Sequence, residues 1–352
     1  MKRAIRFTVA ALLACAAAAC IAAGPGTSPS PSPSLVPADD RRGAEQTLLT
    51  YPEWFLVHSP AEYARTVRSG PPHGFPFLAH VGQLWTGYAA VTREQVRGGH
   101  PLNPGYHLMI GVIATSTTVE YGLRAAYENT VGRLSWMLGD RRSSADDRFA
   151  AQAAQDYVDF IRQEPWYLFD FTARLKWLWA TPLRGPGLPR QLERRYALTS
   201  EYAVKAVYGK LIEWATRAIY TPARMTTAVV VDRLPAPWTP PPRVAVLARY
   251  PDGRALLALP RYFDFRIAAT SLANDGIGIL DIAGNASEIL VTLWKPRDAA
   301  TAPLPGRVLF TQAMSDPPGQ QRVAVLIPVA RLSALLRTAP QQGWTVEHVY
   351  DY

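Results

Sequence analysis

Residues 62–85 read EYARTVRSGPPHGFPFLAHVGQLW, and residues 156–179 read DYVDFIRQEPWYLFDFTARLKWLW. The two stretches align without a gap and share eight identical residues in 24 positions. The identical pairs are Tyr63/Tyr157, Arg68/Arg162, Pro71/Pro165, Phe75/Phe169, Phe77/Phe171, Ala79/Ala173, Leu84/Leu178 and Trp85/Trp179. Self-similarity at a fixed spacing indicates that the chain contains two tandem copies of one structural unit.

A second match follows each stretch at a shorter spacing. Residues 120–127 read EYGLRAAY and residues 201–208 read EYAVKAVY, which indicates a shorter connection in the second copy. We interpret residues 46–220 as a duplicated all-α helical domain, with copies at about 46–140 and 146–220.

Each copy is expected to contain three helices. A short helix ends near the shared proline, a second helix ends at the Leu-Trp pair, and a long helix closes the unit. The long helices are expected at roughly 106–138 and 190–219, where alanine and leucine are frequent and apolar residues recur near every 3.6 positions.

The apolar stretch HLMIGVIATSTTV at 107–119 resembles part of a membrane span. At 13 residues it is too short to cross a bilayer, and Glu120 follows it directly. Its counterpart in the second copy, RQLERRYALTS at 190–200, is expected to face water. We therefore predict that 107–119 is a buried core helix.

The two matched motifs supply the candidate functional residues. On a helix, one stripe carries Glu120, Leu123, Arg124 and Tyr127 in the first copy and Glu201, Val204, Lys205 and Tyr208 in the second. One interpretation is an ordinary i,i+4 ion pair on each helix surface. Another is a buried polar network in which the two long helices pack across a pseudo-twofold axis. A third is a ligand or catalytic site, for which Glu120, Tyr127, Glu201 and Tyr208 are the candidates.

No complete cofactor or metal motif is present. The duplicated glutamates lack the Glu-x-x-His spacing of di-metal carboxylate helices. Five histidines lie between His58 and His107, but without an H-E-x-x-H or comparable spacing. The glycines of 271–287 lack the dinucleotide-binding spacing and are expected to form turns, although Asp281 and Asn285 are polar enough to bind something there. The sequence therefore predicts neither a cofactor nor a metal.

The C-terminal third has a different sequence pattern. From about Thr226, β-branched runs of strand length alternate with turn signals, such as Tyr250-Pro251-Asp252-Gly253. Helices are expected near 262–274 and 330–338. We predict that residues 226–352 form a mostly antiparallel α+β domain, so that the whole chain is an α+β multidomain protein.

The N-terminus indicates export. Residues 1–23 combine a cationic head with an apolar run, as in a signal peptide. Leu12-Leu13-Ala14-Cys15 resembles a bacterial lipobox, which makes Cys15 or Cys20 the candidate for lipidation. An uncleaved membrane anchor and cleavage after Ala19 or Ala23 are the alternatives. The Pro/Ser-rich residues 24–45 are expected to be an extended linker.

Charge and composition limit the kinds of partner that are expected. The formal net charge is +9, but no run of five basic residues occurs, so no nucleic acid is expected. Arg174, Lys176 and Trp177 differ from their counterparts in the first copy and are the candidates for membrane contact.

These features lead to one function and one alternative. We expect a membrane-tethered protein of the bacterial cell envelope, on the extracytoplasmic side, that is a non-enzymatic binding or scaffolding module for an envelope protein or a small molecule. The alternative is an envelope enzyme, similar to a hydrolase or isomerase, that uses the paired Glu and Tyr residues in a groove between the helical halves.

Overall fold

The computed structural model describes residues 34–183, 187–217, 225–298 and 304–351. Contacts between Cα atoms divide the chain into two compact units. Of the described residues, the helical unit contains 54–85 and 104–217, and the α/β unit contains 34–53, 86–103 and 225–351. Residues 46–53 and 86–103, which were expected in the helical domain 46–220, therefore belong to the α/β unit.

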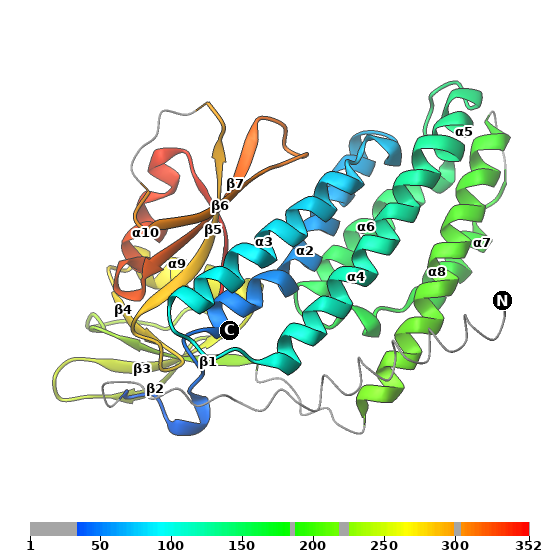
Figure 1. The fold of residues 1–352 in the computed structure, drawn as a ribbon. Coiled ribbons are helices and arrows are strands. Elements are labelled where there is room, and N and C mark those ends of the chain that lie inside the picture. Colours follow the sequence, from blue (N-terminus) through cyan, green and yellow to red (C-terminus); the bar gives the residue numbers. More distant parts are fainter. Residues whose placement is uncertain (1–33, 184–186, 218–224, 299–303, 352) are drawn as a thin grey trace. The chain divides into compact units, whose positions relative to one another are not determined.

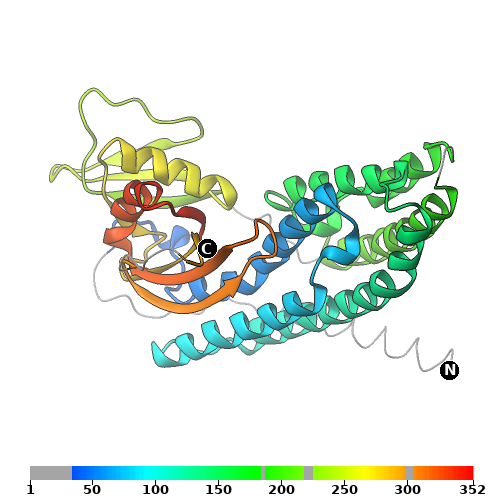
Figure 2. The ribbon, with the colours of Figure 1, turned by 90° about the horizontal axis from the view of Figure 1, so that it is seen from above.

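The first part of the chain is helical, as predicted (Figures 1 and 2). Its helices are α2 (Gln46–Ser69), α3 (Phe77–Arg97), α4 (Pro104–Tyr127), α5 (Arg133–Leu138), α6 (Ala145–Ile161), α7 (Phe171–Ala180) and α8 (Leu188–Arg217). Short 3-10 turns lie at Ala38–Asp40, Pro72–Gly74 and Trp166–Leu168, and a π turn at Glu128–Gly132 joins α4 to α5.

Local sequence explains where several of these helices begin and end. Ser144 and Asp147 form a capping box at the start of α6, and the Asp170 side chain accepts from the Ala173 N–H at the start of α7. Pro71 and Pro165 each follow a helix and begin a 3-10 turn, because proline cannot continue the helical hydrogen bonds.

The matched segments make matching contacts. The ring centres of Tyr63 and Phe75 are 5.3 Å apart, with an angle of 85° between the ring planes. Those of Tyr157 and Phe169 are 5.2 Å apart, with an angle of 82°. Both tyrosines lie 5.8 Å from the second phenylalanine, Phe77 or Phe171, at 44°. The two aromatic clusters are thus built alike, and the tandem duplication that would account for them stays a prediction.

The two segments differ in helix length. The expected helix ending at Trp85 continues to Arg97, whereas its counterpart α7 ends at Ala180. The expectation that the second helix ends at the Leu-Trp pair is therefore wrong for the first copy, where 12 further residues after Trp85 (86–97) are helical, and holds to within one residue for the second.

The α/β unit contains two antiparallel sheets (Figure 1). The first has the order β2-β3-β1-β4 and the second has the order β6-β7-β5-β8. Its elements are β1 (Thr226–Val231), β2 (Ala245–Arg249), β3 (Ala255–Pro260), α9 (Phe263–Asn274), β4 (Ile279–Ile282), β5 (Glu288–Pro296), β6 (Arg307–Ala313), β7 (Gln320–Pro328), α10 (Leu332–Thr338) and β8 (Thr345–Val349). This confirms an α+β domain after the helical region. Each sheet follows the pattern β-β-β-α-β.

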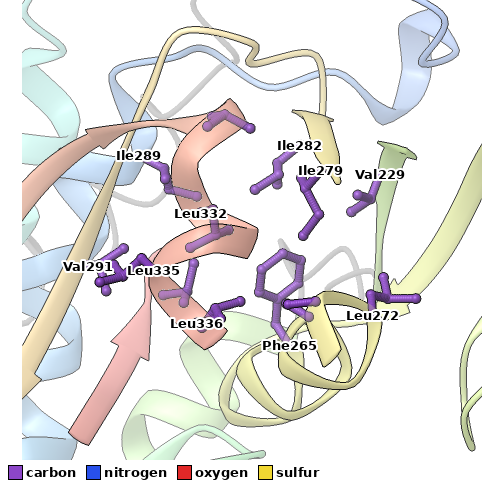
Figure 3. Packing of buried hydrophobic residues seen from close by; sticks show 14 of the residues in the cluster. Val229, Phe265, Leu272, Ile279, Ile282, Ile289, Val291, Leu332, Leu335 and Leu336 are labelled. Carbon is purple, nitrogen blue, oxygen red and sulfur yellow. The ribbon is translucent and has the colours of Figure 1, made fainter. Parts of the chain in front are cut away.

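One apolar core joins the two sheets and their helices (Figure 3). Figure 3 shows Val229 and Val291, one from each sheet, gathered with Phe265 of α9 and Leu332 of α10. These side chains are completely buried, which accounts for the apolar runs recognised as strands in the sequence.

The sequence prediction missed β4, which lies inside the glycine-containing stretch 271–287. Gly276 and Gly284 have φ of 76° and 87°, so both form turns as expected. Asp281 accepts from the Ser34 hydroxyl and the Gly284 N–H, both at 2.7 Å. The polar residues of this stretch therefore stabilise its turn.

Candidate functional site

Four charged side chains meet between α4 and α8. Glu120 and Arg124 come from α4, and Glu201 and Lys205 come from α8; we call these four residues the quartet. Arg124 lies 3.5 Å from Glu120 and 3.6 Å from Glu201. Lys205 lies 3.1 Å from Glu120 and 2.7 Å from Glu201. Each cation therefore contacts both carboxylates, one on its own helix and one on the other.

The two helices run antiparallel through this contact. Glu128, in the π turn directly after α4, contacts Arg194, which precedes Glu201 on α8. Ser135, further along the chain, contacts Glu193. The glutamates of the two motifs thus meet midway along the pair, which is the arrangement that the pseudo-twofold interpretation expects.

The quartet is half-buried. The exposed side-chain fractions are 41% for Glu120, 25% for Glu201, 20% for Lys205 and 19% for Arg124. Burial alone would raise the pKa of Glu201, but attraction from Arg124 and Lys205 is stronger and lowers its pKa to about 2. Burial likewise opposes the charge of Lys205, yet Glu120 and Glu201 raise its pKa above the ordinary value.

Aromatic rings flank both cations. The Arg124 guanidinium lies 4.4 Å from the Tyr63 ring centre and 5.2 Å from that of Phe77. The Lys205 ammonium lies 5.7 Å from Tyr157 and 5.8 Å from Phe171. Each cation–π contact adds about 0.5–1 kcal/mol to the attraction that holds the cation in place. The tyrosines at the quartet are therefore those of the 62–85 and 156–179 segments.

Tyr127 and Tyr208 lie apart from the quartet. At seven residues from the glutamates they are two helical turns away, about 10 Å along the axis. Tyr127 lies 6.0 Å from the Arg194 guanidinium, and Tyr208 stacks on Trp166 at 5.6 Å. Of the four candidates, the structure brings together only Glu120 and Glu201. The tyrosines beside the quartet are Tyr63 and Tyr157, and their identity in the two aligned segments was the sequence signal that could have found them.

A second ionic cluster lies at the start of α8. Three arginines each make two hydrogen bonds to one carboxylate: Arg190 to Asp147, Arg194 to Glu128 and Arg195 to Asp146. Their exposed fractions are 0%, 2% and 4%, respectively. We call these three pairs, with Glu193, the arginine cluster. The expectation that 190–200 faces water is wrong at these arginines, because acidic residues of other elements enclose them.

Further groups complete the arginine cluster. Glu193 contacts both Arg190 and Arg194 and accepts a 2.7 Å hydrogen bond from the Ser135 hydroxyl. Burial would raise the pKa of Glu193, but these contacts outweigh burial and lower it. The guanidinium of Arg190 also donates to the Gly132 carbonyl at 3.0 Å. A network with this many internal partners holds α5, α6 and α8 together.

Ser59, just before the first segment, forms a chain of contacts with His80 and Glu62 of that segment. The Ser59 hydroxyl lies 2.9 Å from His80 Nδ1 and 2.7 Å from the Tyr121 hydroxyl. His80 Nε2 lies 3.6 Å from Glu62. Ser59 is 1% exposed, and His80 and Glu62 are 0% exposed, so all three side chains lie in the interior of the fold. In the second segment Arg174 and Asp156 form the equivalent pair at 2.7 Å.

The candidate membrane residues of α7 lie in different environments. Lys176 and Trp177 are exposed, and Trp177 keeps 61% of its surface. Arg174 is held by Asp156 and lies 5.1 Å from the Trp177 ring centre. A pocket of about 260 Å³ is lined by Phe160, Leu168, Phe169, Asp170, Ala173, Arg174 and Trp177. This volume is below that of ordinary ligand pockets, about 300–1,000 Å³.

Within the described residues, no group of three or more His, Cys, Asp or Glu side chains is arranged to hold a metal ion. His58 lies beside Trp54, and His73 lies beside Trp136. Cys15 and Cys20 lie outside the residues that the structure describes.

No helix in the described part of the chain is both long and apolar enough for a membrane span. The 107–119 segment was expected to be buried, but only Ile110 and Ala114 of it are. Leu108 and Val119 keep 48% and 56% of their surface exposed. That expectation is wrong for most of the segment, because only one side of α4 faces the core.

Comparison of this chain with protein-family models, curated proteins and solved structures finds no match.

Proposed function

We propose that this protein is a membrane-tethered, non-enzymatic binding module of the bacterial cell envelope. The observation that carries the proposal is an apolar surface on α4 and α8, which we call the outer face. It contains Val119, Leu123, Val204, Val207, Leu211 and Trp214, whose exposed fractions are 56%, 68%, 67%, 71%, 36% and 74%. Monomeric proteins seldom expose so many large apolar side chains together, so such surfaces mark interaction sites.

The exposed apolar residues of α4 and α8 lie on the same side of this helix pair. Tyr121 and Tyr202, one residue after the glutamates of the quartet, are buried. Leu123 and Val204, one residue before its cations, are exposed. Because the helices are antiparallel and meet through the same positions, their exposed residues lie on the same side.

The quartet supports binding over catalysis. A general acid or base works best when its pKa lies near the working pH. The pKa of Glu201 is lowered to about 2, and the pKa values of Arg124 and Lys205 are raised. These groups therefore keep their charges at neutral pH, and we assign the quartet to joining the helices beneath the outer face.

The chemistry of the outer face indicates its partner. On α8 the residues Val204, Val207, Leu211 and Trp214 recur at intervals of three and four. This is the spacing by which one helix packs into the apolar groove or seam of another. We propose that the partner is an envelope protein with an apolar helix.

The test is site-specific photo-crosslinking with the full chain in its native envelope. A photoreactive amino acid replaces Leu123 or Val207, and the control position is Gln163, which is also exposed. We expect one discrete protein adduct at positions 123 and 207 and none at 163. The adduct should disappear when Val204→Glu is added, because a charge on an apolar interface is left unpaired.

Two outcomes would contradict the proposal. One is equal adduct formation at all three positions. The other is no protein adduct at 123 or 207 while the melting temperature of the labelled chain is unchanged.

A further inference from the structure

A second exposed apolar surface lies where α5, α7 and α8 meet. It contains Leu134, Met137, Leu138, Trp179, Leu183 and Leu188, with exposed fractions of 54%, 49%, 63%, 59%, 40% and 44%. We call these six residues the apolar tip. Figure 1 shows α5 and the start of α8 at the same end of the helical unit.

The arginine cluster holds the segments of the tip together. Arg190 donates to the Ser135 hydroxyl at 2.9 Å, which joins α8 to α5. Arg195 donates to the Thr181 carbonyl at 2.8 Å, and Gln191 donates to the Pro182 carbonyl at 2.9 Å. The chain beyond α7 is thereby fixed to α8. These hydrogen bonds connect α5, the residues after α7 and the start of α8, which carry the apolar side chains of the tip.

The charge around the tip is mainly positive. Arg133, Arg141, Arg142 and Arg148 are exposed, whereas Asp140 is the exposed acid between residues 133 and 148. Asp146 and Asp147 are buried and paired with arginines of α8. Their charges are neutralised within the fold, so an excess of three positive charges faces solvent.

This combination of apolar and cationic side chains is chemically complementary to the surface of an anionic bilayer. Apolar and tryptophan side chains enter the boundary between headgroups and acyl chains, and neighbouring arginines attract anionic headgroups. A protein partner would be expected to place acidic side chains against these arginines. Residues 1–23 are predicted to reach the membrane, which would bring a bilayer close to the folded chain.

We propose that the apolar tip docks onto the surface of a bilayer that contains anionic lipids. Leu138 and Met137 enter the interfacial zone, and Arg141 and Arg142 bind the headgroups beside them. The inference shares the predicted tether with the proposed function, but it uses a different surface from the outer face.

The experiment uses the full chain reconstituted into vesicles. A photoreactive amino acid replaces Leu138, and the matched control replaces Gln163. One vesicle preparation contains phosphatidylglycerol and phosphatidylethanolamine, and the other contains phosphatidylcholine alone. Mass spectrometry then measures the fraction of chains that carry a covalently attached phospholipid.

We expect lipid adducts at position 138 in the anionic vesicles, at a yield about fivefold or more above position 163. Arg141→Gln with Arg142→Gln should lower this yield about 30-fold, because each arginine near an anionic surface contributes about 1 kcal/mol and about 1.4 kcal/mol corresponds to a factor of ten. Far-UV circular dichroism and the melting temperature establish that the double variant is folded.

Equal lipid yields at 138 and 163 would overturn the proposal, as would yields that are the same in both vesicle types. A protein adduct at 138 in the native envelope, without lipid, would assign the tip to a protein partner instead. Neither result bears on the outer face, whose test reads protein adducts at 123 and 207.

Discussion

The quartet and the arginine cluster are two ionic networks on the same helix, α8, and they differ in depth. The quartet keeps 19–41% of its side-chain surface exposed. The arginines of the cluster keep 0–4%, and their paired carboxylates keep 0–9%. The quartet residues belong to the matched motifs at 120–127 and 201–208, whereas the arginines of the cluster have no matching residues near 107–119. Repetition in the sequence therefore marks the shallower network.

The difference matters for stability because the solvent weakens charge pairs. Exposed pairs contribute about 0–1 kcal/mol, whereas removal of one partner from a buried pair costs about 3–5 kcal/mol. The half-buried quartet belongs between these limits. Variants that change one network at a time test this difference in stability.

The largest effect is expected for Arg194→Met. Arg194 is 2% exposed and makes two hydrogen bonds to Glu128. Its removal leaves a buried carboxylate without that partner, so the free energy of unfolding should fall by about 3–5 kcal/mol. Urea unfolding followed by circular dichroism measures this loss. If Arg194→Met does not fold, Arg194→Lys should still lose about 1–2 kcal/mol, because lysine keeps the charge but not the paired hydrogen bonds.

The matched control is Arg162→Met, at an exposed pair in which Arg162 lies 2.9 Å from Asp159. We expect a change below about 1 kcal/mol. Equal losses for Arg194 and Arg162 would show that burial does not separate the two kinds of pair.

The next effect is expected for Glu201→Gln. Glu201 contacts Lys205 at 2.7 Å and Arg124 at 3.6 Å, and is 25% exposed. The free energy of unfolding should fall by about 1–3 kcal/mol. Glu120→Gln should lose less, about 0.5–1 kcal/mol, because Glu120 is 41% exposed and its pairs are weakened by water. A larger loss for Glu120 than for Glu201 would contradict this ranking.

Acid should remove the contribution of Glu201. Its pKa is lowered from 4.5 to about 2 in the folded chain, so its stabilisation is fully present above pH 4.5 and is lost as the pH falls toward 2. The stability difference between the wild type and Glu201→Gln should therefore shrink by about 1–2 kcal/mol between pH 6 and pH 2.5. Melting temperatures of both proteins across this range measure it. A constant difference would mean that the carboxylate charge does not stabilise the fold.

The smallest effect is expected for Tyr208→Phe. Tyr208 belongs to the repeated motif, but it stacks on Trp166 instead of joining the quartet. Phenylalanine keeps the stacked ring, so the free energy of unfolding should change by no more than about 1 kcal/mol, the value of one hydrogen bond. A loss as large as that of Glu201→Gln would place Tyr208 in the network after all.

Much of the secondary structure could be predicted because local patterns determine it. The long closing helices, the turn at Tyr250–Gly253 and most strands follow from apolar periodicity and turn residues. β4 was missed because its four residues lie among glycines that indicate only turns. The depth of 107–119 was misjudged because apolar composition does not reveal how many sides of a helix are covered.

The sequence by itself determined that two segments share one pattern, that helices precede an α+β domain, and that Glu120 and Glu201 belong together. Only the tertiary structure decided which charges are buried. Arg190, Arg194 and Arg195 look like surface residues in the sequence, since their partners Asp147, Glu128 and Asp146 lie 43 to 66 positions away. Burial and ion pairing depend on such distant neighbours, and local periodicity carries no record of them.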